Sequence, residues 1–217
     1  LANENVETLH AVLIDEKLDA GKSKVVLTTC PHCYNALFND YPQLGGDYTV
    51  MHHTQLIERL MEEGRIPPFK LDESITYHDP CYLGRHNGIY DAPRAVLASG
   101  GGQLVEMPRN RNDSFCCGAG GAQFWKEEEE GDERVSNARY AEAVATGAQV
   151  VATGCPFCKV MLSSASGAEA EGAPQVLDVA QLVAMRLDGI QAMFDHHAAA
   201  AGSATGAGGV APGVSGG

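Results

Sequence analysis

Seven cysteines are the residues of this sequence best suited to chemistry, because thiolates bind metals and exchange electrons. Four of them form two Cys-x-x-Cys pairs, Cys30 with Cys33 and Cys155 with Cys158. Cys116 and Cys117 are adjacent, and Cys81 stands alone. An odd number of cysteines, most of them closely paired, makes a poor disulfide framework. The spacing therefore predicts metal or redox chemistry in a reducing setting such as the cytosol.

The cysteines after residue 80 favour a cofactor larger than one metal ion. In a Cys-x-x-Cys pair both sulfurs can face one metal at a helix N-terminus, where free N–H groups favour negative charge. Cys116 and Cys117 open a glycine-rich run that ends at Gly121, and such a loop lets backbone approach a bulky ligand. Five thiolates are one more than a cubane cluster or a zinc ion requires. The sequence thus predicts one iron–sulfur cluster, held by Cys81, Cys116, Cys117, Cys155 and Cys158.

The cysteine pairs are expected where a buried strand meets a helix. Proline follows the first cysteine of each pair, and proline suits the first turn of a helix. Hydrophobic periodicity predicts strands over 24–28, 48–51, 75–78, 103–107 and 149–152, and helices over 5–20, 31–40, 54–63, 92–99 and 133–146. The predicted fold class is α/β, with two related units of short parallel strands and flanking helices.

An internal repeat supports the two units. The nine residues that end at Cys33 align with the nine that end at Cys158, at an offset of 125. Further on, Val50 and Gln55 align with Val176 and Gln181, at an offset of 126. We predict the C-terminal part of a first unit at 1–66, a complete second unit at 67–195, and a disordered Ala/Gly tail at 196–217. The first unit's counterparts of Cys81, Cys116 and Cys117 would precede residue 1, so a longer parent chain is expected.

The order Cys81, Cys116-Cys117-Gly118, Cys155-x-x-Cys158 resembles the CCG cysteine-rich domain over roughly residues 24–190. That family includes the B-type and D-type components of heterodisulfide reductase and the iron–sulfur component of glycolate oxidase. The tail and the run from Tyr77 to Arg85 look most like actinobacterial iron–sulfur-binding reductases. The resemblance implies a [4Fe-4S] cluster, cubane or non-cubane, on the five cysteines of the second unit. Cys30 and Cys33 match only two ligands of the first unit, whose cluster would need the full-length protein.

What the resemblance implies for function is electron transfer. The chain would pass electrons between a flavin, ferredoxin or quinone partner and a thiol/disulfide or hydroxy-acid couple. The substrate, both redox partners, the oligomeric state and the choice between catalysis and relay stay open. A membrane anchor upstream would hold the protein at the cytoplasmic face of the membrane.

Two other functions compete with this interpretation. A tandem thioredoxin-like dithiol oxidoreductase would explain Cys-Pro-His-Cys between a strand and a helix, but it leaves Cys81, Cys116 and Cys117 unused. A structural zinc site could join the two Cys-x-x-Cys pairs, although their separation is long for a zinc ribbon.

Several polar residues near the cysteines are weaker candidates. His78 could act as a proton shuttle or as a hydrogen-bond donor to a cluster sulfur, and it is the candidate catalytic residue. Arg85 and His86 could neutralise negative charge. Asp79 is expected to be a turn residue. His52-His53 resembles a metal pair, but its place in the repeat favours a strand-to-helix cap.

The overall composition excludes two classes of protein. The net charge of −13, with only 15 Lys and Arg, argues against a nucleic-acid surface. The sequence has no run of apolar residues long enough to span a bilayer.

Overall fold

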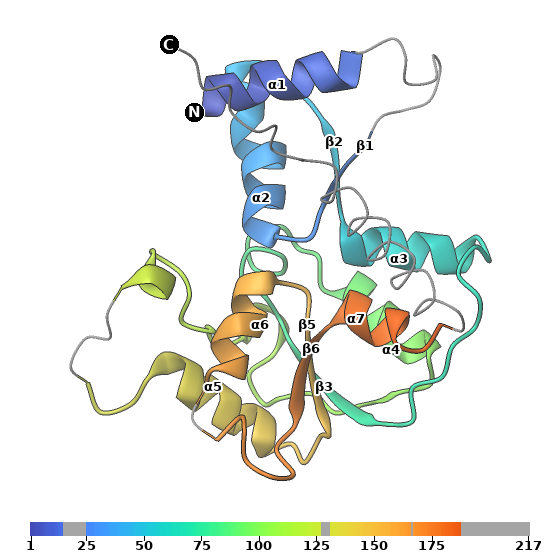
Figure 1. Cartoon of the computed structure of the whole chain (residues 1–217), viewed down its shortest axis with the longest axis vertical. Coiled ribbons are helices and arrows are strands. Elements are labelled where there is room, and N and C mark those ends of the chain that lie inside the picture. The colour runs from blue at the N-terminus through green and yellow to red at the C-terminus, as the bar shows by residue number, and fades with distance from the viewer. Residues whose placement is uncertain (15–24, 127–130, 166, 188–217) are drawn as a thin grey trace, which may run out of the picture.

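The computed structural model describes residues 1–14, 25–126, 131–165 and 167–187 (Figure 1). Within these residues no helix is both long and apolar enough to cross a membrane. The end of the first predicted helix and the predicted tail at 196–217 lie outside the described residues.

The larger unit is built on a parallel sheet in the order β4-β3-β5-β6. Its central strands pair Ile75 with Val150 and His78 with Thr153. Helices cover both faces, which is why the central strands β3 and β5 are buried almost throughout (Figure 1). The bounds are β3 Ser74–His78, α4 Asp91–Ser99, β4 Gln103–Leu104, α5 Val135–Val144, β5 Val150–Thr153, α6 Pro156–Ser163, β6 Gln175–Asp178 and α7 Val179–Ala184.

Two hydrophobic clusters fix that sheet between its helices. On one face Ile75 and Val150 pack with Val96 of α4 and Leu182 of α7. On the other face Val151 packs with residues of α5 and α6, such as Tyr140 and Leu162. Because successive strand residues point to opposite faces, neighbours Val150 and Val151 enter different clusters. The sheet is therefore buried on both sides, and its strand ends are held firmly.

The smaller unit carries a two-stranded parallel sheet, in which Val25 pairs with Thr49 and Thr28 with His52. Its small core is formed by Tyr34, Tyr48 and Val50. The bounds are α1 Ala2–Ile14, β1 Val25–Thr28, α2 Pro31–Asn35, a π-helical turn Ala36–Asp40, a 3-10 turn Tyr41–Leu44, β2 Thr49–His52 and α3 His53–Glu62. Figure 1 shows this unit above the larger one, with α3 against α4 and α7.

The predicted fold class and repeat are confirmed. Strand β1 with helix α2 corresponds to β5 with α6, and β2 with α3 corresponds to β6 with α7. Even the helix caps correspond. His52 caps α3 by accepting from the Thr54 N–H, Asp178 caps α7 by accepting from the Ala180 N–H, and a glutamine three residues on completes each capping box. The prediction that His52 lies at a cap is thus confirmed.

Two predicted elements are wrong in extent. The strand expected over 103–107 ends at Leu104, after which the Val105 N–H makes one more bond to the Ile75 carbonyl and Asn110 donates to the Met107 carbonyl in the following turn. The helix expected over 31–40 is α-helical only to Asn35 and continues as a π-helical turn.

Candidate metal centre

The site lies where strands β3 and β5 end side by side. His78 and Thr153 are register partners at these ends, and the chain then delivers Cys81 from one strand and Cys155 from the other. Parallel strands place their carboxyl ends at one edge, which is where open α/β sheets bind ligands. The fold therefore brings two distant segments to the same place.

The Cys155 pair sits at the N-terminus of α6. Cys155 is the N-cap residue and is fully buried, and Cys158 is buried one turn later. The pKa of the Cys155 thiol is lowered to about 5, chiefly by a hydrogen bond from Cys158, with further help from His32 and from backbone N–H groups of α6. The helix terminus thus favours a thiolate here.

The Cys116-Cys117 loop reaches the same point from another direction. Gly118 adopts φ +88°, which reverses the chain just after Cys117, and its N–H donates to Cys116 Sγ at 3.2 Å. Cys117 is buried. Hydrogen bonds from Cys116, Cys158 and His78 hold the pKa of Cys117 well below its usual range.

The structure packs three of the five cysteines of the second unit, Cys117, Cys155 and Cys158, into one buried cluster. Cys117 Sγ, Cys158 Sγ and a ring nitrogen of His78 lie within 4.8 Å of one another. Cys155 contacts Cys158. Burial raises the pKa of Cys81, and the charges of Cys117 and Cys155 raise it further. Thiols from three segments of the chain therefore lie in one region of the molecule.

The cysteines of the first unit face the same centre through a histidine. His32 Nδ1 lies 3.7 Å from Cys30 Sγ, and the same ring hydrogen-bonds Cys155 of the second unit. These two contacts raise the pKa of His32 to about 10. The His32 ring also packs on Tyr82 at 4.3 Å. Cys33 remains exposed. His32 thus joins the two units beside the cysteines.

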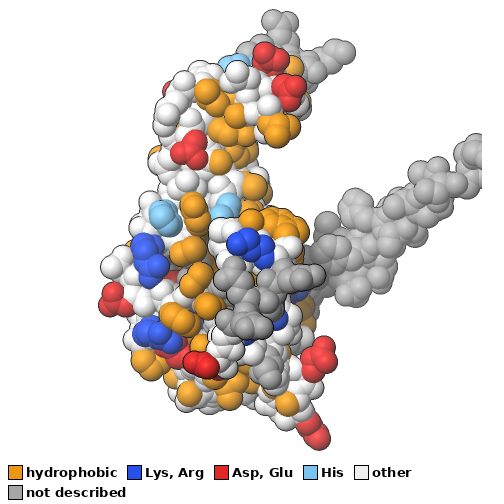
Figure 2. Space-filling view, turned by 90° about the vertical axis from the view of Figure 1, so that its left-hand side faces the viewer, with side chains coloured by type: hydrophobic (Ala, Val, Ile, Leu, Met, Phe, Trp, Pro, Cys, Tyr) orange, Lys and Arg blue, Asp and Glu red, His pale blue; other side chains and the backbone are white. Residues whose placement is uncertain are grey.

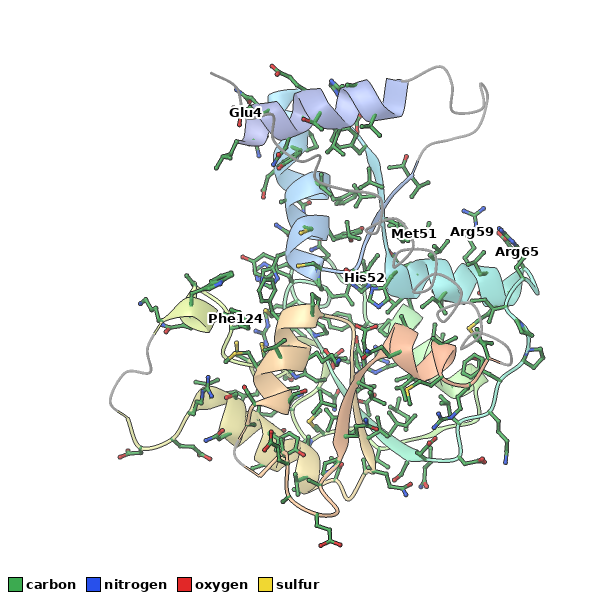
Figure 3. All side chains as sticks on the ribbon, viewed as in Figure 1. Glu4, Met51, His52, Arg59, Arg65 and Phe124 are labelled. Atoms are coloured by element: carbon green, nitrogen blue, oxygen red, sulfur yellow. The ribbon has the colours of Figure 1, made fainter. Side chains whose placement is uncertain are left out.

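Aromatic rings border the α6 side of the centre. Figure 3 shows Phe124 near the N-terminal end of α6, and its ring contacts Phe157 edge-on at 5.3 Å. Trp125 packs on Phe157 as well, at 5.7 Å. In Figure 2 hydrophobic side chains run in a band over the face that is shown, between histidines and Lys or Arg side chains. Phe124 and Phe157 pack against the buried cluster of Cys117, Cys155 and Cys158, and this apolar cover limits the access of water to the sulfurs.

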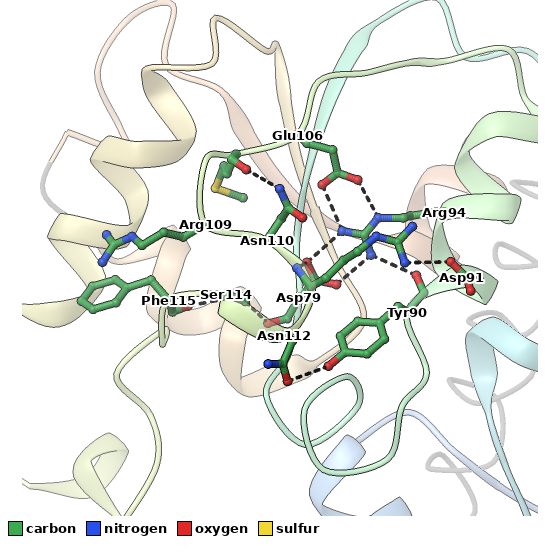
Figure 4. Close-up of polar contacts among 12 residues, drawn as sticks. Asp79, Tyr90, Asp91, Arg94, Glu106, Arg109, Asn110, Asn112, Ser114 and Phe115 are labelled. Atoms are coloured by element: carbon green, nitrogen blue, oxygen red, sulfur yellow. Dashed lines mark hydrogen bonds and ion pairs between the residues drawn. The ribbon is translucent and has the colours of Figure 1, made fainter.

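An arginine clamp holds the loops that carry Cys81 and Cys116 (Figure 4). Arg94 binds both carboxylate oxygens of Asp79, at 2.7 and 2.8 Å, and both of Glu106. Asp79 also accepts the Arg111 backbone N–H at 2.7 Å. The prediction that Asp79 serves only a turn is incomplete, because its side chain ties three segments together.

Arg85 and His86 take structural positions. Arg85 donates to the carbonyl oxygens of Asn112 and Ser114, just before the Cys116 loop. His86 stacks on Tyr82 at 4.4 Å. His53, which follows the His52 cap, binds Asp178 of the other unit at 3.0 Å. None of these three contacts is with a cysteine.

Sequence reasoning missed His32, Arg94 and Arg139 as members of the site. His32 carried a signal, since it lies inside a Cys-x-x-Cys pair and replaces the phenylalanine of the repeat. Arg94 and Arg139 carried none, because each lies on a helix and finds its partners only after folding.

Comparison with known proteins gives the family. Residues 75–163 match the sequence profile of the cysteine-rich domain known as CCG. Through these residues the chain belongs to the CCG cysteine-rich domain family. The resemblance seen in the sequence is confirmed, and the matched range holds all five cysteines of the second unit.

Named relatives are iron–sulfur or oxidoreductase proteins. The chain is 40% identical over 188 residues to the EtfAB:quinone oxidoreductase of Syntrophomonas wolfei, a match covering 82% of this chain and 26% of the relative. It is 44% identical over 177 residues to the probable iron-sulfur-binding oxidoreductase FadF of Bacillus subtilis, a match that covers 80% of this chain and 24% of the relative. It is 38% identical over 164 residues to the D-type component of the dihydromethanophenazine:CoB–CoM heterodisulfide reductase of Methanosarcina acetivorans. This match covers 73% of this chain and 38% of the relative. The chain thus spans only a quarter to two fifths of these relatives.

Proposed function

We propose that this chain is the iron–sulfur electron-transfer part of a heterodisulfide-reductase-like oxidoreductase. The observation that carries the proposal is the buried cluster of Cys117, Cys155 and Cys158. Cys116 is next to it in sequence, and Cys81 follows the neighbouring strand end, so we propose all five as ligands. Names of the relatives agree with this class of protein.

The donor set fits an iron–sulfur cluster. Sulfur ligands are soft and anionic, and Cys117, Cys155 and Cys158 are buried together with the N-terminus of α6 beside them, which favours negative charge on sulfur. Gly118, with its positive φ, keeps the adjacent cysteines turned around a shared centre. We propose [4Fe-4S] stoichiometry, since five thiolates exceed what zinc takes. A bound cluster would supply one-electron donation and acceptance.

The roles of the chain's own residues follow from their positions. The five thiolates would bind the cluster, and the aromatic side chains of Phe124 and Phe157 would exclude water from it. Cys30 and Cys33 would supply part of a second cluster site in the first unit, 1–66. As redox partners we propose a flavin, ferredoxin or quinone on one side and a thiol/disulfide or hydroxy-acid couple on the other. A location at the cytoplasmic face of the membrane belongs to the same proposal.

The test is anaerobic purification with iron and sulfide analysis and EPR. We expect a brown protein with stoichiometric iron and sulfide, and a Cys117→Ser variant with much less of both. Cys33→Ser is the matched control, because that exposed thiol lies outside the five and its loss should leave the second-unit cluster in place. A colourless, zinc-loaded protein would contradict the proposal, as would a metal-free dithiol with a thioredoxin-like potential.

A further inference from the structure

His78 lies between the sulfurs and a buried arginine. It is the last residue of β3, a central strand, and only 1% of it is exposed. A ring nitrogen of His78 lies within 4.8 Å of the Cys117 and Cys158 sulfurs. Arg139 Nε donates to His78 Nδ1 at 3.0 Å. The ring is thus close both to two sulfurs and to a guanidinium.

Arg139 is held so that it can only donate to His78. It projects from α5, and none of its side chain is exposed. Its Nη1 donates to the Arg109 carbonyl and to Glu142 Oε2, both at 2.9 Å, and its Nη2 to Ser114 Oγ at 3.4 Å. A guanidinium has donors and no acceptor. The contact with His78 therefore has one direction, from Arg139 to the ring.

That direction decides which ring nitrogen carries the hydrogen. Because Nδ1 accepts the Arg139 N–H, Nδ1 itself must lack a hydrogen. A neutral imidazole has one N–H, so the hydrogen is on Nε2. Cys117 Sγ lies within 4.8 Å of a ring nitrogen of His78, and Nε2 is the nitrogen that has a hydrogen to donate to this sulfur. The ring is thereby set as a donor to sulfur.

We infer that Arg139 is a positioning residue that makes His78 a hydrogen-bond donor to the Cys117 sulfur and prevents His78 from acting as a metal ligand. The alternative, a site of His78, Cys117 and Cys158 around one ion, needs a free lone pair on the ring. Arg139 occupies the lone pair of Nδ1, and Nε2 carries the hydrogen. This inference rests on the proposed function, since it assigns a role toward the cluster.

The consequence is control of the reduction potential. Hydrogen bonds to cluster or ligand sulfurs stabilise the more negative, reduced state and so raise the potential. Removal of either His78 or Arg139 should therefore move the potential in the negative direction. A purely structural arginine would change stability and leave the potential where it was.

A double-mutant cycle on the anaerobically purified protein tests the inference. We expect His78→Ala and Arg139→Met to shift the midpoint potential negative with unchanged iron content, and the double variant to match His78→Ala. Additive shifts would show that Arg139 does not act through His78 and would overturn the inference. Loss of iron in His78→Ala would overturn it too, because His78 would then be a ligand.

Glu142→Gln is the matched control. It removes the carboxylate charge that pairs with Arg139 Nη1 while leaving the Nε contact with His78. We expect its potential to stay near that of the wild type. A shift as large as that of Arg139→Met would assign the effect to the ion pair and overturn the inference.

A measurement on the unaltered protein guards against variants that fail to fold. With ¹⁵N-labelled histidine, pulsed EPR of the reduced cluster should show a weak nitrogen coupling that disappears in His78→Ala. A strong coupling, as from a directly bound nitrogen, would overturn the inference. A wild-type protein without iron or sulfide would overturn the proposed function and this inference with it, whereas an iron-loaded protein with unshifted variants would overturn only this inference.

Discussion

At the scale of single residues, Gly118 is the position at which the cysteine loop depends most on backbone freedom. Its φ is +88°, and an added Cβ would lie 3.3 Å from Val135 Cβ. Gly118→Ala should lower the free energy of unfolding by about 1–2 kcal/mol, the usual cost of a left-handed alanine, and should reduce iron binding. Urea titration and iron analysis measure both. Gly120→Ala is the control, because an added Cβ there meets nothing within 4 Å, and equal losses in the two variants would contradict the argument.

The buried pair of Arg94 and Asp79 is a second feature on which the loops depend. Arg94→Met leaves the Asp79 carboxylate, 2% exposed, without its bidentate partner. Breaking a buried ion pair in this way costs about 3–5 kcal/mol, and we expect that loss of unfolding free energy in urea. Arg59→Met removes an exposed ion pair with Glu63 and should lower the free energy of unfolding by about 0.5 kcal/mol or less. Similar losses in Arg94→Met and Arg59→Met would show that the clamp contributes little.

Residue-scale prediction from the sequence succeeded where partners are local and failed where they are distant. The cysteine spacing and the cap at His52 can be read from nearby residues. Asp79 and Arg94 are also close in sequence, yet their pairing depends on how β3 and α4 pack. His78 was nominated for its place before Cys81, but Arg139, which directs its ring, follows 61 residues later on another element. Nothing in the local pattern marks such a contact.

At the scale of elements, the cap of α7 also joins the two units. Asp178 accepts the Ala180 N–H at 2.8 Å and binds His53 of α3 at 3.0 Å. Asp178→Ser keeps a capping oxygen and loses the His53 contact, whereas Asp178→Ala loses both. We therefore expect Asp178→Ala to be less stable than Asp178→Ser by about 1 kcal/mol, measured by thermal or urea unfolding. Equal stability of the two variants would mean that water satisfies the Ala180 N–H as well as a capping side chain does.

Elements were predictable because both units repeat one pattern. Apolar runs and a proline after each first cysteine gave strands β1, β2, β3 and β5 and the helices that follow them. The strand β6 and helix α7 were not predicted, although Val176 and Gln181 align with the first unit. The pattern also did not give the end of β4 or the π-helical turn after Asn35, because element ends are set less sharply by sequence than their existence is. The pairing of β3 between β4 and β5 likewise follows from packing on both faces.

At the scale of the whole molecule, the two units meet at an ionic contact between His32 of α2 and Cys155 at the start of α6. The pKa of His32 is raised to about 10 from its ordinary 6.5, first by its hydrogen bond to Cys155 and then by Cys30. The pKa of Cys155 is lowered to about 5 from 9.0, with Cys158 the first cause and His32 a further one. In the iron-free protein this contact is thus an imidazolium beside a thiolate over a wide pH range.

The pH dependence of stability tests this contact in the iron-free protein. A group with a raised pKa stabilises the fold below its unfolded value, here 6.5, and loses that contribution as the pH rises through about 10. A group with a lowered pKa stabilises the fold above its unfolded value, here 9.0, and loses that contribution as the pH falls through about 5. Between pH 6.5 and 9.0 the contribution of His32 to the unfolding free energy falls with pH while that of Cys155 rises, so the two changes cancel. The unfolding free energy of the wild type should therefore change little there through these two groups, and its margin over His32→Gln should shrink toward pH 5 and above pH 10. Urea unfolding of both proteins across this range measures the margin, and one that keeps growing above pH 10 would show that no imidazolium–thiolate pair joins the units.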